Sequence, residues 1–185
     1  RVNILLITAR PFEGDVNYRS ISRPLVDLID AQDLPAEVTV LRPPTFRRLE
    51  DLLTARPNYY HIVHFDGHGS YGTTSGASHD PHQLKAPEGR LYFEDDEGNP
   101  APITAEQLSV LLRKHHLPAV VLNACQSAMV DENAADPFAS VAASLLRSGI
   151  RSVVAMAYSL YVSGAQEFLP AFYRDLFRTG SLSKA

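Results

Sequence analysis

Short runs of β-branched and aliphatic residues alternate along this chain with segments of helical period, and this alternation limits the folds open to it. In one such segment, Leu49, Leu52 and Leu53 recur at the spacing of a buried helix face. Strands that alternate with helices form parallel sheets covered by helices on both faces. We therefore predict one α/β domain over residues 1–185 with a mostly parallel sheet, whose strands are Val2–Thr8, Glu37–Leu41, Tyr59–Phe65, Ala119–Leu122 and Ser152–Met156.

Local signals mark the ends of the expected helices. Thr45 precedes a helical segment that runs to about Ala55 and is a suitable N-cap. Thr104 and Gln107 have the spacing of a capping box. Gly149 follows the segment Pro137–Arg147, and glycine commonly ends a helix.

The stretch Ser70–Pro102 interrupts the alternation. It is rich in glycine and proline and poor in aliphatic residues, and only Arg90–Phe93 has a β-like composition. An insertion of this length between a strand and the next helix is usually functional or disordered. Two interpretations stay open: the stretch forms a wall or flap of a site, or it is a surface loop.

The chain has one cysteine, Cys125, which follows a strand predicted to be buried on both faces. Ligands of open α/β sheets bind beyond the carboxyl ends of the strands, so this position faces the expected site. A lone cysteine is more often an inert buried thiol. His68 favours the reactive alternative, because it follows another strand and we expect Gly67 and Gly69 to leave it on a loop.

The sequences Phe65–Gly69 and Leu122–Ser127 resemble the paired His-Gly and Ala-Cys motifs of caspase-like cysteine peptidases, specifically of the bacterial CHAT domains. Caspases likewise carry their histidine about 50 residues before the cysteine. The resemblance extends over essentially the whole chain, since Ile7–Phe12, Arg19–Pro24 and Phe168–Leu176 are also similar to CHAT sequences.

This resemblance implies a caspase-like three-layer sandwich and a cysteine endopeptidase that needs no cofactor. Cys125 would be the nucleophile and His68 the general base and acid, with the amides of Gly69 and Cys125 stabilising the oxyanion. It further implies a bacterial protein with a protein substrate, whose other domains or subunits switch proteolysis on in antiviral defence or cell-death signalling. We expect Ser70–Pro102 and Ala128–Pro137 to rearrange on activation.

His64, Asp66 and His68 alternate in the sequence, and on one continuous strand they would share a face that could hold zinc. Because the neighbouring glycines argue against a continued strand, we expect no metal and place His64 in the core or beside the site. Asp66 is a candidate to orient His68, although caspase-like enzymes are usually described as dyads.

Substrate-binding candidates follow from the same resemblance. Asn123 stands two residues before the cysteine, a position that lines or supports the primary specificity pocket in relatives, although asparagine is also common in turns. On the loop after the first strand, Asp15 would favour a basic residue before the scissile bond, and Arg10 or Arg19 an acidic one. Tyr158 is the candidate after the last strand. A solvated loop explains these charges equally well.

Composition argues against several other classes. The net charge is −4 and basic residues occur at most in pairs, so the basic footprint of a nucleic-acid-binding protein is missing. No apolar run approaches the roughly 20 residues that span a bilayer, and no signal peptide is visible. One cysteine cannot form an internal disulfide, which fits a reducing cytoplasm. Because the chain opens on Arg1, we expect a domain of a longer protein.

Two other function classes stay open. The chain could be a caspase-like binding module that signals by association, in which Cys125 is incidental. It could also be a metal-dependent hydrolase that uses His64, Asp66 and His68. Thiol alkylation would abolish the peptidase and spare the metalloenzyme, and a chelator would do the reverse.

Overall fold

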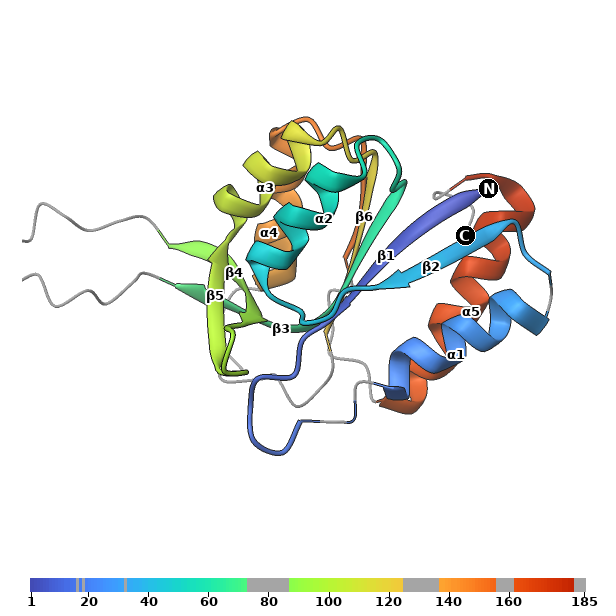
Figure 1. Ribbon diagram of the computed structural model, residues 1–185, viewed down its shortest axis with the longest axis horizontal. Coiled ribbons are helices and arrows are strands. Elements are labelled where there is room, and N and C mark those ends of the chain that lie inside the picture. Colours follow the sequence, from blue (N-terminus) through green and yellow to red (C-terminus); the bar gives the residue numbers. More distant parts are fainter. Residues whose placement is uncertain are drawn as a thin grey trace, which may run out of the picture.

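The computed structural model describes residues 1–15, 17, 19–31, 33–72, 87–124, 137–155 and 162–181. Within these residues, five strands pair in parallel at the centre of the molecule (Figure 1). Their order across the sheet is β2 (Ala36–Val40), β1 (Val2–Thr8), β3 (Ile62–Gly72), β6 (Ala119–Ala124) and β7 (Ser152–Ala155). The predicted α/β fold with a mostly parallel sheet is confirmed.

The described helices cover the sheet in two groups (Figure 1). Helices α1 (Arg19–Ala31) and α5 (Val162–Thr179) pack together on one face, and α2 (Phe46–Ala55), α3 (Ala105–Lys114) and α4 (Pro137–Arg147) lie on the other. This arrangement is a three-layer sandwich, as expected. None of the described helices is both long and apolar enough to cross a membrane.

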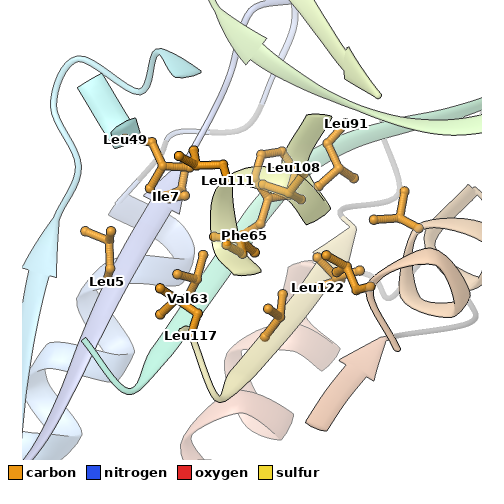
Figure 2. Close-up of a cluster of buried hydrophobic side chains, with 14 of the residues drawn as sticks. Leu5, Ile7, Leu49, Val63, Phe65, Leu91, Leu108, Leu111, Leu117 and Leu122 are labelled. Atoms are coloured by element: carbon orange, nitrogen blue, oxygen red, sulfur yellow. The ribbon is translucent and has the colours of Figure 1, made fainter. Parts of the chain in front are cut away.

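Successive side chains of each strand point to opposite faces, and each face therefore has its own apolar core. Ile7, Phe65 and Leu122 belong to the cluster beneath α2, α3 and α4 (Figure 2). Ile4 and Val121 belong to the second cluster, which α1 and α5 cover. Burial on both faces accounts for the nearly continuous apolar runs of the central strands.

The predicted helix signals are confirmed. The Thr45 hydroxyl accepts a hydrogen bond from the Arg48 amide at 3.1 Å. Thr104 and Gln107 form a reciprocal capping box at the start of α3. Gly149, with φ of 99°, lies two residues after Arg147, the last residue of α4, and adopts the left-handed conformation that glycine allows at helix ends.

Strand β3 is longer than the sequence suggested, and the prediction that His68 lies on a loop is wrong. From Ile62 to Gly67 the strand pairs in parallel with β6, and from His68 to Gly72 it pairs antiparallel with β4 (Glu88–Glu94). The second partner supplies a new hydrogen-bonding ladder just where β6 ends, so the glycines do not break the strand. Neither Gly67 nor Gly69 has a positive φ.

Strands β4 and β5 (Pro100–Thr104) form an antiparallel extension of the sheet. The β-like patch predicted at Arg90–Phe93 is confirmed as part of β4. The sequence did not predict β5, and the second half of Ser70–Pro102 belongs to the sheet rather than to a surface loop. Prolines 100 and 102 fit this structure, because β5 pairs only with β4 in the described part of the chain and an edge strand tolerates proline. Residues 73–86 lie outside the described residues, and their role as a flap stays a prediction.

Candidate functional site

A row of three polar side chains crosses the sheet at the carboxyl ends of its central strands. Thr8 on β1 is in register with Asp66 on β3, which is in register with Asn123 on β6. All three residues are buried, and the last two are fully so. Polar groups at this edge of an α/β sheet are unusual for a core and typical of a binding site.

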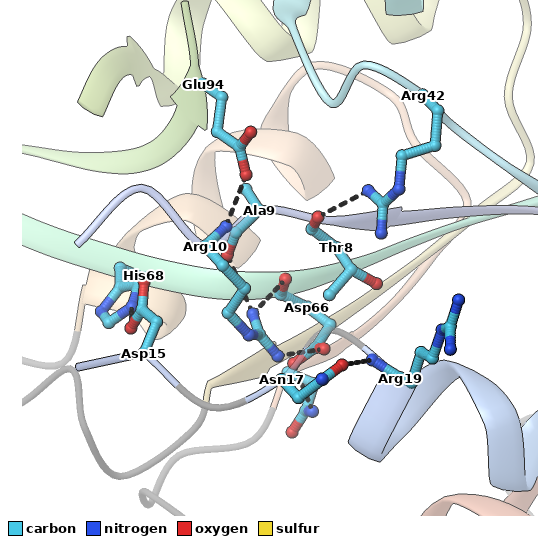
Figure 3. Close-up of polar contacts among 11 residues, drawn as sticks. Thr8, Ala9, Arg10, Asp15, Asn17, Arg19, Arg42, Asp66, His68 and Glu94 are labelled. Carbon is cyan, nitrogen blue, oxygen red and sulfur yellow. Dashed lines mark hydrogen bonds and ion pairs between the residues drawn. The ribbon is translucent and has the colours of Figure 1, made fainter. Parts of the chain in front are cut away.

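Arg10 and Asn123 both contact the Asp66 carboxylate, and Figure 3 shows the contact from Arg10. The Arg10 guanidinium lies 2.5 Å from Oδ2 of Asp66 and donates a second hydrogen bond to the Asp66 backbone carbonyl at 2.9 Å. The amide nitrogen of Asn123 donates to Oδ1 at 3.0 Å. Asp66 is thus engaged with these two residues, and the expectation that it orients His68 is not supported.

The carboxylate that contacts His68 comes from Asp15. Nε2 of His68 lies 2.5 Å from Oδ1 of Asp15, and the two side chains are only 8% and 5% exposed. The Phe12 ring meets the His68 ring edge-on, with 4.7 Å between centroids, and it also contacts Tyr92 of β4. An ion pair or charge-assisted hydrogen bond is stronger in such a shielded position than in water.

The loop after β1 is folded so that Asp15 reaches His68. The amide of Phe12 donates to Oδ2 of Asp15 at 2.9 Å, and the amide of Asp15 donates back to the Phe12 carbonyl at 3.2 Å. Gly14 between them has φ of 85°, which glycine adopts without strain. At the base of the loop, the Arg10 amide donates to Glu94 of β4 at 2.8 Å.

The structure places the other predicted site residues as follows. Asn123 lies inside β6 rather than in a turn, and its Oδ1 has no hydrogen-bond partner among the described residues. Gly69 is buried in β3 in register with Leu91. Cys125 and Tyr158 lie outside the described residues. So does most of Ala128–Pro137, and the rearrangement expected there and in Ser70–Pro102 stays a prediction.

His64 is a core residue, which confirms one of the two positions expected for it. It is fully buried and its Nδ1 lies 2.9 Å from the hydroxyl of Tyr173 on α5. Burial lowers the pKa of His64 to about 3, because the charged imidazolium loses its hydration, and the ring is neutral at pH 7. Burial likewise raises the pKa of Tyr173.

The described residues contain no group of three or more His, Cys, Asp or Glu side chains that could hold a metal ion. The expectation that the glycines end the strand before His68 was wrong, because β3 continues from His64 through Asp66 to His68. The three side chains nevertheless have separate partners, which are Tyr173, Arg10 and Asp15 respectively.

The contact between Asp15 and His68 was missed at the sequence level. The two residues are 53 positions apart, and no periodicity or local motif connects a loop carboxylate with a strand histidine. The only local signal is Gly14, which indicates a turn immediately before Asp15.

The sequence matches the family model of the CHAT domain over residues 23–185. A search of curated proteins finds no match. The matched region includes β3, β6 and every described helix apart from the first residues of α1.

Proposed function

Because the chain belongs to the CHAT domain family, which has a caspase-like fold related to cysteine peptidases, we propose that it is a cysteine endopeptidase domain. Cys125 is the nucleophile and His68 the general base and acid. The observation that carries the proposal is the placement of His68: it is a shielded histidine with a carboxylate partner, at the carboxyl edge of the parallel sheet and beside the end of β6.

Chain connectivity supports the pairing of His68 with Cys125. Gly67 is in register with Ala124, and the next residues along the chain are His68 and Cys125. Consecutive Cα atoms are about 3.8 Å apart and paired strands about 4.8 Å, so the Cα atoms of His68 and Cys125 are separated by at most about 12 Å. Chain connectivity therefore keeps the two residues near each other, which the proposed Cys-His pair requires.

The chemistry follows from the residue types. His68 takes the proton of the Cys125 thiol, and the thiolate adds to the substrate carbonyl carbon. The amides of Gly69 and Cys125 donate to the oxyanion. When the tetrahedral intermediate collapses, the C–N bond breaks and His68 gives its proton to the leaving amine. Water, deprotonated by His68, then hydrolyses the thioester and restores the thiol.

The described part of the specificity region supports a neutral side chain before the scissile bond. The Arg10 guanidinium is paired with Asp66, so an acidic substrate would compete with a buried carboxylate for it. Oδ1 of Asn123 is a buried acceptor without a partner among the described residues, and it would accept from a substrate amide or hydroxyl. Tyr158 stays a proposed substrate contact. Regulation of proteolysis by domains or subunits outside this chain also stays a proposal.

Labelling with an electrophilic thiol probe, followed by intact mass, tests the proposal. An ordinary thiol is only a few per cent ionised at neutral pH. We expect rapid labelling of Cys125 at pH 6 to 7 that falls about tenfold or more in His68→Ala. His61→Ala is the matched control, because His61 is exposed and lies just before the start of β3, away from His68. The same variants are then assayed with peptide libraries.

Slow labelling that follows an ordinary thiol titration in both the native protein and His68→Ala would contradict the Cys-His pair. That result would favour the binding module. Activity that survives alkylation of Cys125 and is lost with a chelator would instead favour a metal-dependent hydrolase.

A further inference from the structure

Asp15 was expected on the substrate side of the site, but its contacts indicate another role. One carboxylate oxygen contacts Nε2 of His68 at 2.5 Å and the other accepts the Phe12 amide at 2.9 Å. Both oxygens of Asp15 are therefore engaged inside the protein. At 5% exposure, its side chain has little surface left for a basic substrate residue.

We propose that Asp15 is a positioning residue for His68, acting as the third member of a Cys-His-Asp arrangement. The catalytic role of Asp15 rests on the proposed function, whereas its contact with His68 is observed directly. An ionised carboxylate can only accept a hydrogen bond, so Nε2 of His68 is the donor. In the neutral ring the lone pair then lies on Nδ1, and Nδ1 is the nitrogen that receives the thiol proton.

The surroundings fix the ring as well as its tautomer. Phe12 closes one side of the His68–Asp15 pair through an edge-on contact, and Tyr92 supports Phe12 from β4. The loop itself is anchored by the bond from the Arg10 amide to Glu94. When the thiol proton moves to Nδ1, the imidazolium that forms lies next to the Asp15 carboxylate. The carboxylate therefore stabilises the thiolate–imidazolium pair, which is the role an orienting acid has in a catalytic triad.

The experiment compares Asp15→Ala, Asp15→Asn and Glu13→Gln in the otherwise native chain. Glu13→Gln is the matched control, because it removes one negative charge from an exposed position of the same loop. Asp15→Asn retains an oxygen that can accept from Nε2 but lacks the charge. Circular dichroism and the imidazole signals of His61 report whether each variant keeps the native fold.

The primary measurement is the tautomer of His68, read from the imidazole nitrogen shifts of a ¹⁵N-histidine-labelled sample at a pH where the ring is neutral. We expect the Nε2–H tautomer in the native protein and in Glu13→Gln, and loss of this preference in Asp15→Ala. Thiol labelling should slow about tenfold or more in both Asp15→Ala and Asp15→Asn, because the Asn amide can also donate to the ring and so does not fix its tautomer. For peptide substrates, kcat should fall for every sequence while KM changes little.

An Nδ1–H tautomer in the native protein would overturn the proposal, and so would an Asp15→Ala variant that behaves like Glu13→Gln. A rise in KM confined to substrates with a basic residue would also overturn it, because that result assigns Asp15 to substrate binding. If Cys125 is unreactive in every variant, the proposed peptidase function fails, and the tautomer measurement alone decides whether Asp15 positions His68.

Discussion

Gly67 is the position where one added methyl group should have the largest predictable effect on stability. A Cβ at Gly67 would lie 2.9 Å from Cζ and 3.0 Å from Cε1 of Phe65, and 3.3 Å from the backbone carbonyl oxygen of Ala9. Real Cβ contacts under 3.0 Å essentially do not occur, so the Phe65 ring must move. Phe65 is fully buried and packs on Phe93 at 5.3 Å between centroids, which leaves it little room.

Gly67→Ala should therefore lower the free energy of unfolding by about 1–3 kcal/mol, the usual cost of inserting a methyl group into a filled core. Gly72→Ala is the matched control on the same strand, because a Cβ there meets nothing within 4 Å. Neither glycine has a positive φ, so both alanines are compatible with the backbone. The control should be neutral or stabilising by a few tenths of a kcal/mol, since alanine reduces the entropy of the unfolded chain.

Urea unfolding followed by far-ultraviolet circular dichroism measures both variants. Phe65→Leu supplies the third corner of a double-mutant cycle: the smaller side chain makes room, and the cost of Gly67→Ala should fall by at least about 0.5 kcal/mol in that background. Equal stability of Gly67→Ala and Gly72→Ala would refute the steric argument. A cost of Gly67→Ala that is unchanged in the Phe65→Leu background would show that the Ala9 carbonyl, rather than the ring, sets the penalty.

Two further predictions concern buried polar side chains. His64 is neutral in the folded protein because burial lowers its pKa to about 3. Its contribution to the free energy of unfolding is therefore complete above the ordinary histidine pKa of about 6.5. As pH falls from 6.5 toward 3 this contribution is lost, by up to about 1.4 kcal/mol per pH unit. Urea unfolding at pH 7 and 5 should show a shallower decline of stability for His64→Gln than for the native protein, and equal slopes would contradict the reasoning. Arg10→Ala leaves the fully buried Asp66 carboxylate without its guanidinium and should cost about 3–5 kcal/mol in the same assay at pH 7. Arg178→Ala removes an exposed pair and should change stability by less than about 1 kcal/mol; an equal loss in both arginine variants would show that the burial of Asp66 does not matter.

Features that depend on neighbouring residues in the chain were predicted from the sequence. Thr45 and Gly149 mark helix ends through contacts within a few residues, and the central strands are apolar because both of their faces are covered. The same logic failed at the end of β3. Gly67 and Gly69 have weak intrinsic strand propensity, and that local tendency predicted a break.

The outcome at β3 was decided by β4, which supplies a second ladder to residues 68–72. Pairing between strands depends on partners distant in the sequence, and propensity alone does not contain that information. Gly67 is required for close packing against Phe65 rather than for a turn. The prediction thus identified an unusual position and assigned it the wrong physical cause.

The sequence by itself determined the α/β class, the layered architecture and the choice of His68 and Cys125 as the candidate pair, because periodicity, capping and motif order are local properties. Only the tertiary structure decided which carboxylate serves which partner. Asp66 stands two residues from His68 yet pairs with Arg10, whereas Asp15, 53 residues away, contacts the imidazole. Strand direction and loop folding set these distances, since a buried charge must find its counter-charge wherever the fold brings one within reach.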